Sequence, residues 1–472
     1  MKNRAVKLNP NIFRAYDIRG IVGDDITPEV AEVIGKAIGT FLLQKKHGNQ
    51  LVVGMDNRHS SEELKASLIL GLRSTGCNIT DIGLCTSPMM YRAVYEGKAA
   101  GGIIVSASHN PKEYNGFKVV GREAYPVAAE EMYLLRDLAI SGKFIESQAK
   151  TAVTKQNTQA QYINKILDEI HPERKIKVVV DTGNGVAGKF APDLYRRLGC
   201  DVVEVHCDLD GDFPNHLPNP EHEANLLDAM KAVVETGVDF GIGIDGDGDR
   251  VGLIDEQGRF LSADYTIILL ARDYLKRHPG ATILIDVKSS LNVIDEIKRN
   301  GGVPLLYKTG HSLIKMKMRA ENIMLGGEFS GHFYVFENYF PFDDALYSSS
   351  KLIEIISQSN KPISEHFTNL RKLYATSLIE LGCPDAVKFE VMDKVISLLS
   401  STHEVKNIDG ARIEFPSGWA ILRASNTSPF LTFRAESVSE KGLREILDEM
   451  HHILQGFPTI DLKPLEKVMP DI

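Results

Sequence analysis

The sequence predicts an α/β protein made of three similar mixed α/β domains and a C-terminal α+β domain. A unit of strand, loop, helix, glycine and second strand occurs three times, and its first strand is expected at 51–55, 177–180 and 282–285. Each first strand is an apolar run that ends at an Asp, which is typical of strands buried in a parallel sheet. After about Tyr374 the pattern changes to short strands and one amphipathic helix.

Within each unit, the order of elements suits a right-handed βαβ crossover. The helices are expected at about 61–74, 188–198 and 291–299, and the second strands at 78–82, 201–205 and 303–307. A helix over 27–43 precedes the first unit, because Thr27-Pro28-Glu29 is a typical helix start. The copies are too far apart for a solenoid repeat, so they predict separate domains.

The last region predicts a small α+β domain. Its strands are expected at 411–415, 419–423 and 431–436, and its helix at 443–454. Polar segments at 148–161 and 256–258 mark the expected limits between the earlier domains. We therefore predict domains at residues 1–153, 154–258, 259–371 and 372–472.

The composition argues against several classes of protein. The chain has 472 residues and a formal net charge of -9, which is unsuited to general binding of nucleic acid or a membrane surface. No apolar run approaches the length of a membrane span. The five cysteines include no Cys-x-x-Cys pair, and no signal peptide is evident. These features predict a protein of the reducing cytoplasm.

The first candidate functional segment is Ser106-Ala107-Ser108-His109-Asn110-Pro111, which follows an apolar strand expected at 102–105. Small neighbours let other groups approach the Ser108 hydroxyl, and Lys118 follows within reach of the loop. A serine in this position suits nucleophilic or phosphoryl chemistry. An ordinary turn is the alternative, because Ser, Asn and Pro are common turn residues.

The second candidate segment contains Asp245, Asp247 and Asp249, which alternate with glycines after an apolar strand. Three carboxylates this close repel one another unless a cation lies among them. Oxygen ligands indicate a hard cation, Mg²⁺ first and Mn²⁺ second. Together with Glu256 the spacing also matches a calcium-binding EF-hand loop, but Arg250 stands where that loop needs Gly. A solvated acidic turn is the other alternative.

The third candidate segment is the glycine-rich loop at 326–332. It presents Glu328, Ser330 and His332, whose carboxylate, hydroxyl and imidazole suit sugar hydroxyls. A turn between two strands is the alternative. A polar loop is also expected at 308–312, where His311 alone is weak evidence for a site.

Two further segments carry hydrogen-bond donors. Arg423, Ser425, Asn426 and Thr427 lie between two expected strands and would make a good phosphate cradle, to which Arg434 could add a second cation. The N-terminal segment 13–20 offers two arginines and a tyrosine. For the segment at 423–427, the alternative is a polar hairpin loop. For the segment at 13–20, it is a surface salt-bridge segment.

These motifs occur in the order serine loop, three-Asp loop, sugar loop and phosphate cradle, one per domain. In this respect the chain resembles the α-D-phosphohexomutase family, and within it the bacterial phosphomannomutase/phosphoglucomutase branch, over nearly its whole length. The resemblance implies four domains around a central active-site cleft, with a phosphoserine at Ser108. It also implies metal ligands at Asp245, Asp247 and Asp249, with the Ser108 phosphate as a further ligand.

The site residues predicted on this basis fall into two groups. The catalytic group comprises Ser108, Lys118, His332, His311, Arg19 and His109. The substrate-binding group comprises Tyr16, Arg250, Lys288, His311, Glu328, Ser330, His332, Arg423, Ser425, Asn426, Thr427 and Arg434.

The implied activity is interconversion of hexose 1-phosphate and hexose 6-phosphate, for mannose and glucose, through a phosphoserine and a hexose 1,6-bisphosphate. One Mg²⁺ per chain and glucose 1,6-bisphosphate as activator are implied with it. The expected partners are small hexose phosphates, without nucleic acid or membrane, and the expected state is a monomer, with a weak homodimer as the alternative.

Some departures from the family pattern leave the sugar open. Ser106-Ala107-Ser108 also occurs in phosphoglucosamine mutases, whereas Asn426-Thr427 points away from that branch. Phe329 stands where the dual-specificity branch commonly has Met. A phosphoglucosamine mutase, a metal-dependent sugar phosphatase and a non-catalytic sugar-phosphate sensor are therefore the alternative functions.

Overall fold

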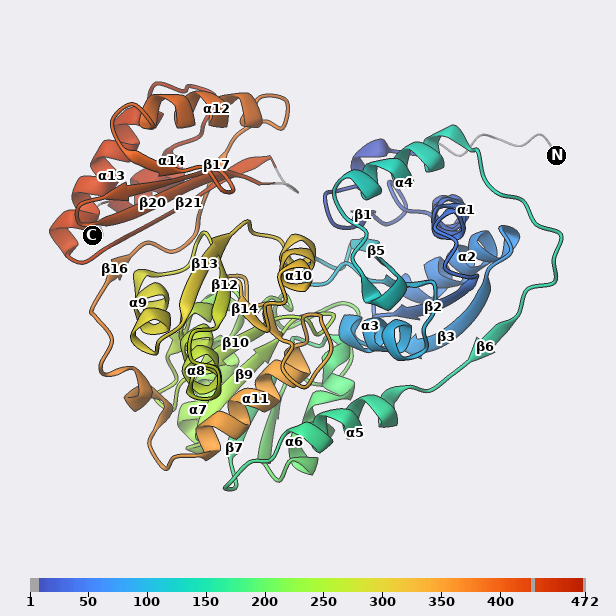
Figure 1. The fold of residues 1–472 in the computed structure, drawn as a ribbon, viewed down its shortest axis with the longest axis horizontal. Helices are drawn as coiled ribbons and strands as arrows, with labels where there is room; N and C mark the ends of the chain where they lie inside the picture. The colour runs from blue at the N-terminus through green and yellow to red at the C-terminus, as the bar shows by residue number, and fades with distance from the viewer. Residues whose placement is uncertain (1–7, 426–428, 470–472) are drawn as a thin grey trace.

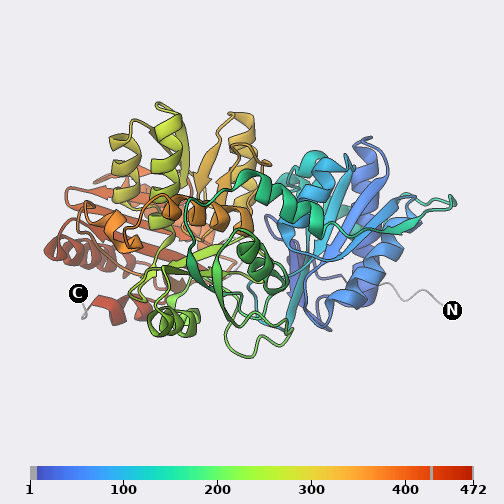
Figure 2. The same ribbon diagram turned by 90° about the horizontal axis from the view of Figure 1, so that it is seen from below.

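The computed structural model describes residues 8–425 and 429–469 and has the predicted fold class: three mixed α/β units and a C-terminal α+β unit, here called domains I to IV. Domains I and IV lie at opposite ends, with domains II and III between them (Figures 1 and 2). In this described part of the chain no helix is long and apolar enough to cross a membrane.

Domain I has a six-stranded sheet in the order β1-β5-β4-β2-β3-β6. Its strands are β1 (Ile18–Ile21), β2 (Gln50–Met55), β3 (Asn78–Leu84), β4 (Gly101–Val105), β5 (Tyr114–Gly121) and β6 (Val153–Lys155). Its helices are η1 (Pro10–Ile12), α1 (Pro28–Gln44), α2 (Ser61–Ser74), α3 (Ser87–Glu96), η2 (Arg122–Ala124) and α4 (Glu130–Ser141). The predicted crossover is confirmed, because β2 pairs parallel with β3.

Domain II has a five-stranded sheet in the order β11-β10-β9-β7-β8. Its strands are β7 (Lys177–Asp181), β8 (Asp201–Val205), β9 (Phe240–Ile244), β10 (Val251–Ile254) and β11 (Phe260–Leu261). Its helices are α5 (Gln159–Glu169), η3 (Val186–Lys189), α6 (Ala191–Arg197), η4 (Glu223–Asn225) and α7 (Leu227–Thr236).

Domain III has a four-stranded sheet in the order β13-β12-β14-β15. Its strands are β12 (Thr282–Asp286), β13 (Val303–Tyr307), β14 (Leu325–Gly327) and β15 (Phe333–Val335). Its helices are α8 (Ala263–Arg277), α9 (Leu291–Arg299), α10 (His311–Ala320), α11 (Ala345–Ser357) and η5 (Ile363–Phe367).

Domain IV has an antiparallel sheet in the order β16-β21-β20-β19-β18, and β17 also pairs with β21. Its strands are β16 (Tyr374–Ala375), β17 (Ile379–Gly382), β18 (Glu404–Lys406), β19 (Ala411–Phe415), β20 (Gly418–Ala424) and β21 (Phe430–Ser437). Its helices are α12 (Lys388–Leu399), α13 (Glu440–Leu454) and α14 (Lys463–Val468).

The structure corrects the predicted elements at four places. The polar segment 148–161 contains β6, an exposed edge strand paired with β3, which has no apolar pattern to reveal it. The turn at 256–258 leads into β11, so the second sheet extends beyond residue 258. The helix expected over 188–198 is a 3-10 turn followed by α6. The polar loop expected at 308–312 is already helical from His311, where α10 begins.

Domains I, II and III share one apolar core, and domain I has a second core of its own around α1 and α2. Domain IV contributes to neither and has a separate core. The shared core runs from Met89 and Met90 on α3 through domain II to α8 and α11 of domain III. The core of domain IV lies between its sheet and helices α12 and α13. A small cluster of Val287, Trp419 and Ile421 joins domain IV to domain III.

Candidate active site

The three-Asp loop joins the antiparallel strands β9 and β10 and is fully buried. Gly246 permits a close approach from domain I, because a Cβ there would lie 2.3 Å from the Ser108 carbonyl oxygen. Gly248 has a φ of +77°, which favours glycine. Asp245 Oδ1 accepts the backbone N–H groups of Asp249 and Arg250, so it holds the loop closed.

Ser108 lies on the loop between β4 and β5, with a φ of +51° that is unusual for a serine. Its Oγ donates to Asp245 Oδ2 at 2.7 Å and lies 3.2 Å from His109 Nδ1. Burial, followed by Arg250 and Arg19, lowers the pKa of His109 well below its ordinary value. The serine predicted from the sequence therefore directly contacts the predicted metal loop of another domain.

Lys118 on β5 reaches the same cluster. Its Nζ lies 2.5 Å from Asp247 Oδ2 and 2.6 Å from Asp249 Oδ2. Burial opposes the charge on Lys118, but Asp247 and Asp249 outweigh it and raise its pKa well above the ordinary value. The ammonium group is therefore a cation among the three carboxylates.

The electrostatics of the cluster favour a bound cation. Burial, and then Asp249 and Asp247, raise the pKa of Asp245 well above its ordinary value. Burial also raises the pKa of Asp249. Lys118 and His332 lower it by more, so the pKa of Asp249 is well below its ordinary value. Asp247 Oδ1 and Asp249 Oδ1 are buried without a hydrogen-bond partner among the described residues. Such oxygens fit a hard metal ion.

Domain III brings two histidines to the cluster. His332 Nε2 lies 3.3 Å from Asp249 Oδ1, and its Nδ1 lies 2.9 Å from Ser330 Oγ. His311 at the start of α10 stacks on His332 with ring centroids 5.3 Å apart. Burial, followed by Lys315, lowers the pKa of His311 to about 4. Both rings thus lie at one edge of the carboxylate cluster.

Glu328 is buried and already engaged by protein groups. Its Oε1 accepts the Gly310 N–H at 2.7 Å, and its Oε2 accepts the Tyr334 hydroxyl at 2.5 Å. Each carboxylate oxygen has a second lone pair, so further acceptance is chemically possible.

The N-terminal residues reach two different neighbours. The Tyr16 hydroxyl donates to the Thr309 carbonyl of domain III at 3.3 Å. Arg19 donates to Asn110 Oδ1 on the serine loop and to Asp17. Arg250 directly follows Asp249 of the three-Asp loop, and its Nη1 lies 3.5 Å from Glu221 Oε2. The segment expected to offer donors therefore bridges domains I and III.

The segment predicted to form a phosphate cradle lies at the end of β20. Arg423 Nε donates to Asp409 Oδ2 at 3.0 Å, and the same oxygen accepts the Thr309 N–H at 3.1 Å. The backbone N–H of Ser425 donates to the Phe430 carbonyl. Asn426 and Thr427, which were predicted to complete the cradle, lie outside the described residues.

Arg434 does not lie with the rest of the cradle. It is buried between domains III and IV, where it contacts Asp264 at 3.2 Å and donates to the Lys288 carbonyl. Its guanidinium also lies 4.0 Å from the centre of the Phe329 ring. The Lys288 ammonium lies 5.5 Å from the centre of the same ring. In this arrangement Arg434 and Lys288 hold the two domains together.

The structure also reveals site residues that the sequence analysis missed. Ser87 at the start of α3 donates to Asp247 Oδ2 at 2.6 Å. Asp343 is buried 2.6 Å from Lys315 and 3.3 Å from His311. Arg58 contacts the carbonyl groups of the serine loop. Of these residues, only Arg58 had a sequence signal, because it lies between the strand expected at 51–55 and the helix expected at 61–74.

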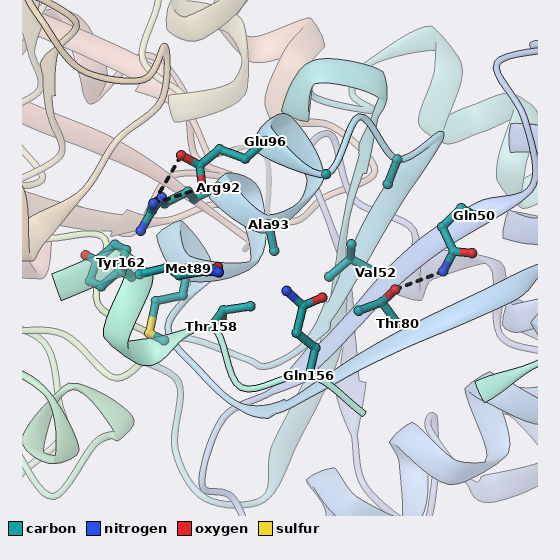
Figure 3. A pocket seen from close by; sticks show the side chains of 13 residues that line it. Gln50, Val52, Thr80, Met89, Arg92, Ala93, Glu96, Gln156, Thr158 and Tyr162 are labelled. Atoms are coloured by element: carbon teal, nitrogen blue, oxygen red, sulfur yellow. Dashed lines mark hydrogen bonds and ion pairs between the residues drawn. The ribbon is translucent and has the colours of Figure 1, made fainter. Parts of the chain in front are cut away.

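A cavity lies away from this cluster, between α3, β2, β3 and the chain leading into α5. Figure 3 shows Arg92 and Glu96 paired beside it, and Gln50 bonded to Thr80. None of the predicted site residues lines this cavity. The cavity is therefore separate from the Ser108 cluster.

The fold and the site together define a class of protein. A serine hydroxyl, a buried three-carboxylate loop, an ammonium group and two histidines converge from three domains, and an arginine-bearing loop follows in a fourth. This combination is suited to phosphoryl transfer at a metal site.

The comparisons with known proteins agree with this class. Domains I, II and III of the phosphoglucomutase/phosphomannomutase alpha/beta/alpha type match residues 10–145, 160–258 and 262–374, and the C-terminal domain matches 378–453. The phosphomannomutase/phosphoglucomutase of Pseudomonas syringae pv. tomato is 40% identical over 468 residues, which cover 98% of this chain and 97% of that protein. The chain belongs to the phosphoglucomutase/phosphomannomutase family.

Other relatives extend the comparison. The phosphoglucomutase of Neisseria meningitidis serogroup A is 36% identical over 454 residues, covering 95% of this chain and 98% of that one. A crystal structure of a phosphoglucomutase/phosphomannomutase family protein from Burkholderia thailandensis aligns with a TM-score of 0.88 at 35% identity. It covers 95% of this chain and 98% of its own. The predicted family and fold class are thus confirmed.

Proposed function

We propose that the chain is a monomeric mutase that interconverts the 1-phosphates and 6-phosphates of mannose and glucose in the cytoplasm. The observation that carries this proposal is the contact of Ser108 Oγ with Asp245 at 2.7 Å. Lys118 contacts Asp247 and Asp249 of the same loop, and His332 contacts Asp249. The nucleophile, the cation site and the proton-transfer groups therefore form one buried cluster.

Asp245, Asp247 and Asp249 are the proposed ligands of one Mg²⁺, together with the phosphate on Ser108. When bound, this ion would supply neutralisation of the negative charge on the transferred phosphoryl group. Asp247 Oδ1, which is buried without a hydrogen-bond partner among the described residues, supports this assignment. The all-oxygen chemistry of the three carboxylates favours Mg²⁺ over softer metals.

In the proposed reaction, the free hydroxyl of a hexose 1-phosphate attacks the phosphorus on Ser108. The new sugar O–P bond forms as the Ser108 Oγ–P bond breaks. A base in the site takes the proton of the attacking hydroxyl, and an acid in the site gives a proton to the leaving Ser108 Oγ. The hexose 1,6-bisphosphate then turns over and returns its other phosphate to Ser108. Added glucose 1,6-bisphosphate would activate the enzyme by phosphorylating the same serine.

The proton-transfer groups are proposed from their positions. His109 is next to Ser108 Oγ. His332 and Lys118 contact the carboxylates beside which the phosphoryl group would lie. Their roles exchange between the two half-reactions, since the acid of one direction is the base of the other. Arg19 and His311 assist from the neighbouring shell of the site.

Substrate binding is proposed for domains III and IV. Glu328 would accept hydrogen bonds from the C3 and C4 hydroxyls, whose configuration mannose and glucose share. Arg423, Ser425, Asn426 and Thr427 would hold the non-reacting phosphate in both orientations of the sugar. A phosphate is nearly symmetric, so one cradle serves both binding modes.

A coupled isomerisation assay with the 1-phosphates of mannose, glucose and glucosamine tests the proposal. We expect turnover with mannose and glucose and little with glucosamine. Release of inorganic phosphate without isomerisation would instead identify a sugar phosphatase. Turnover with the glucosamine phosphate alone would identify a phosphoglucosamine mutase.

A further inference from the structure

The structure assigns Arg58 as the residue that positions Ser108 for phosphoryl transfer. Arg58 lies on the loop between β2 and α2, and only 3% of it is exposed. Among the described residues, Arg58 donates no hydrogen bond to the loop at 326–332 or to the three-Asp loop, so its role is to hold the serine loop. This inference rests on the proposed function, in which Ser108 carries the phosphoryl group.

All five N–H groups of the Arg58 guanidinium are used. Nη2 donates to the carbonyl oxygens of Ser108 at 2.7 Å and Asn110 at 2.6 Å. Nη1 donates to the carbonyl oxygens of Pro111 at 2.8 Å and Tyr114 at 3.0 Å. Four carbonyl dipoles of one loop therefore converge on a single buried cation, which offsets their mutual repulsion.

The guanidinium is itself held in place. Its Nε donates to Asp56 Oδ2 at 3.1 Å, and Asp56 Oδ1 accepts the Ser61 hydroxyl at 2.5 Å and the Arg58 N–H at 3.1 Å. The Phe213 ring of domain II covers the guanidinium at 4.9 Å. The Arg58 guanidinium is thus held by Asp56 of domain I and covered by Phe213 of domain II.

The conformation that Arg58 holds is the one the chemistry needs. Ser108 has a φ of +51°, a left-handed conformation that a serine adopts only when its surroundings impose it. In this conformation the Ser108 carbonyl points to Arg58 and its Oγ contacts Asp245. Releasing the carbonyl would let the loop relax and misplace the Oγ.

Lysine cannot replace this arginine. An ammonium group has three N–H donors on a flexible stem and cannot keep four carbonyls and a carboxylate together. Arg58→Lys therefore keeps the charge and loses the geometry. Because misplacement of a reacting atom by about 1 Å can cost on the order of 10²-fold in rate, a large kinetic effect is expected.

The test is a single-turnover measurement. Dephosphorylated enzyme is mixed with glucose 1,6-bisphosphate, and the phosphorylation of Ser108 is followed by intact mass. We expect Arg58→Lys to slow this step by about 10-fold to 10²-fold and to lower kcat with little change in KM. Arg272→Lys is the matched control, since Arg272 also binds a buried carboxylate, Glu296, and a backbone carbonyl, but lies outside the site.

The outcomes separate the possible failures. A folded Arg58→Lys variant that is phosphorylated within about twofold of the wild-type rate would overturn the assignment. If Arg58→Lys does not fold, Asp56→Asn loosens the same guanidinium while keeping the side-chain shape, and a wild-type rate there would overturn it equally. If the wild type itself is never phosphorylated at Ser108, the proposed function fails instead.

Discussion

The two halves of the candidate site are built in different ways. The half that contains Ser108 and the three-Asp loop lies where domains I, II and III share one apolar core. The half that contains Glu328 and the cradle lies where domain IV, with a separate core, meets domain III. The contact there includes a small apolar cluster and charged groups around Arg434 and Asp264. It also includes hydrogen bonds from Arg412 to the carbonyl groups of Val287 and Ser289.

This difference indicates which part of the site is preorganised. Ser87, Ser108 and Lys118 of domain I all bond to the three-Asp loop of domain II, so the chemical half is assembled before any substrate binds. The recognition half depends on how domain IV rests on domain III. We therefore expect substitutions in the first half to abolish chemistry and those in the second to change binding and its pH dependence.

The largest effect is expected for Ser108→Ala. Loss of the hydroxyl removes the group proposed to carry phosphate, so turnover should fall by on the order of 10³-fold or more. Protein as purified should also carry phosphate at Ser108 in part of the population, which peptide mapping checks. Full activity in the variant, with phosphate found only at other residues, would contradict the proposed role of Ser108 as the phosphate carrier.

A slightly smaller effect is expected for Asp245→Asn. The variant loses one charge from the cation site and the acceptor of the Ser108 hydroxyl, so affinity for Mg²⁺ and turnover should both fall, the latter by about 10²-fold. Titration of activity with Mg²⁺ measures this. Exhaustive chelation should abolish turnover of the wild type, and persistent activity would mean that the Asp loop is structural.

In the recognition half, Glu328→Ala should cost about 2–4 kcal/mol in transition-state stabilisation, equally for mannose and glucose phosphates. The readout is kcat/KM for the two sugars. Tyr334→Phe is the control, because it removes only the hydroxyl that donates to Glu328. If Glu328→Ala lowers kcat/KM for one sugar and leaves it unchanged for the other, the carboxylate contacts the C2 hydroxyl, at which the two sugars differ.

The charged contact between domains III and IV should make stability depend on pH. Burial raises the pKa of Asp264 to about 6, although Arg434 opposes the shift. The folded protein therefore binds a proton at Asp264 between about pH 4 and 6 that the unfolded chain does not. Ionisation of Asp264 above this window lowers stability by up to about 3 kcal/mol.

Asp264→Asn removes that titration. Compared with the variant, the wild type should gain thermal stability as the pH falls from about 7.5 to 5. Melting midpoints at both pH values check this. Asp273→Asn on the same helix removes another buried carboxylate and is the control. Equal pH dependence of the melting midpoint in wild type and Asp264→Asn would mean that ionisation of Asp264 does not affect stability.

The smallest effect is expected for Phe329→Met. The ring lies against Arg434 and Lys288 and has no donor or acceptor for a sugar hydroxyl. Loss of the cation–π contacts should cost about 1 kcal/mol or less in stability, and the mannose-to-glucose ratio of kcat/KM should hardly change. A reversed sugar preference would show that the residue touches the substrate.

The local pattern of the sequence predicted the fold class and the central strands of the domains, but it gave no limits for helices such as α3, α7 and α8. The limits of α2, α9 and β13 were predicted to the residue, since each combines clear periodicity with a distinct start and stop. The strand β6 was missed, because three exposed residues have no apolar pattern. Its pairing with β3 depends on a contact that is distant in sequence.

The chemical groups of the site were predictable, but their supports were not. Ser108 and Asp245 were identified from short motifs, and the structure brings them together. Arg58 and Asp343 act through contacts with residues from other elements, so no spacing reveals them. Arg434 was expected to bind phosphate, yet a buried partner, Asp264, holds it between two domains. Pairings of this kind exist only once the chain has folded.

The separate core of domain IV also bears on how such an enzyme can change over time. We expect mutations inside that core to alter the end of β20, where Arg423 lies, and to spare the packing beside the Ser108 loop, because the core shares no residue with the apolar cluster that contains Val105 and Phe117 there. Selection can therefore explore new sugars in one part of the molecule while the reacting groups stay intact in another. Substrate range and reaction type are then inherited as separable traits of a single chain.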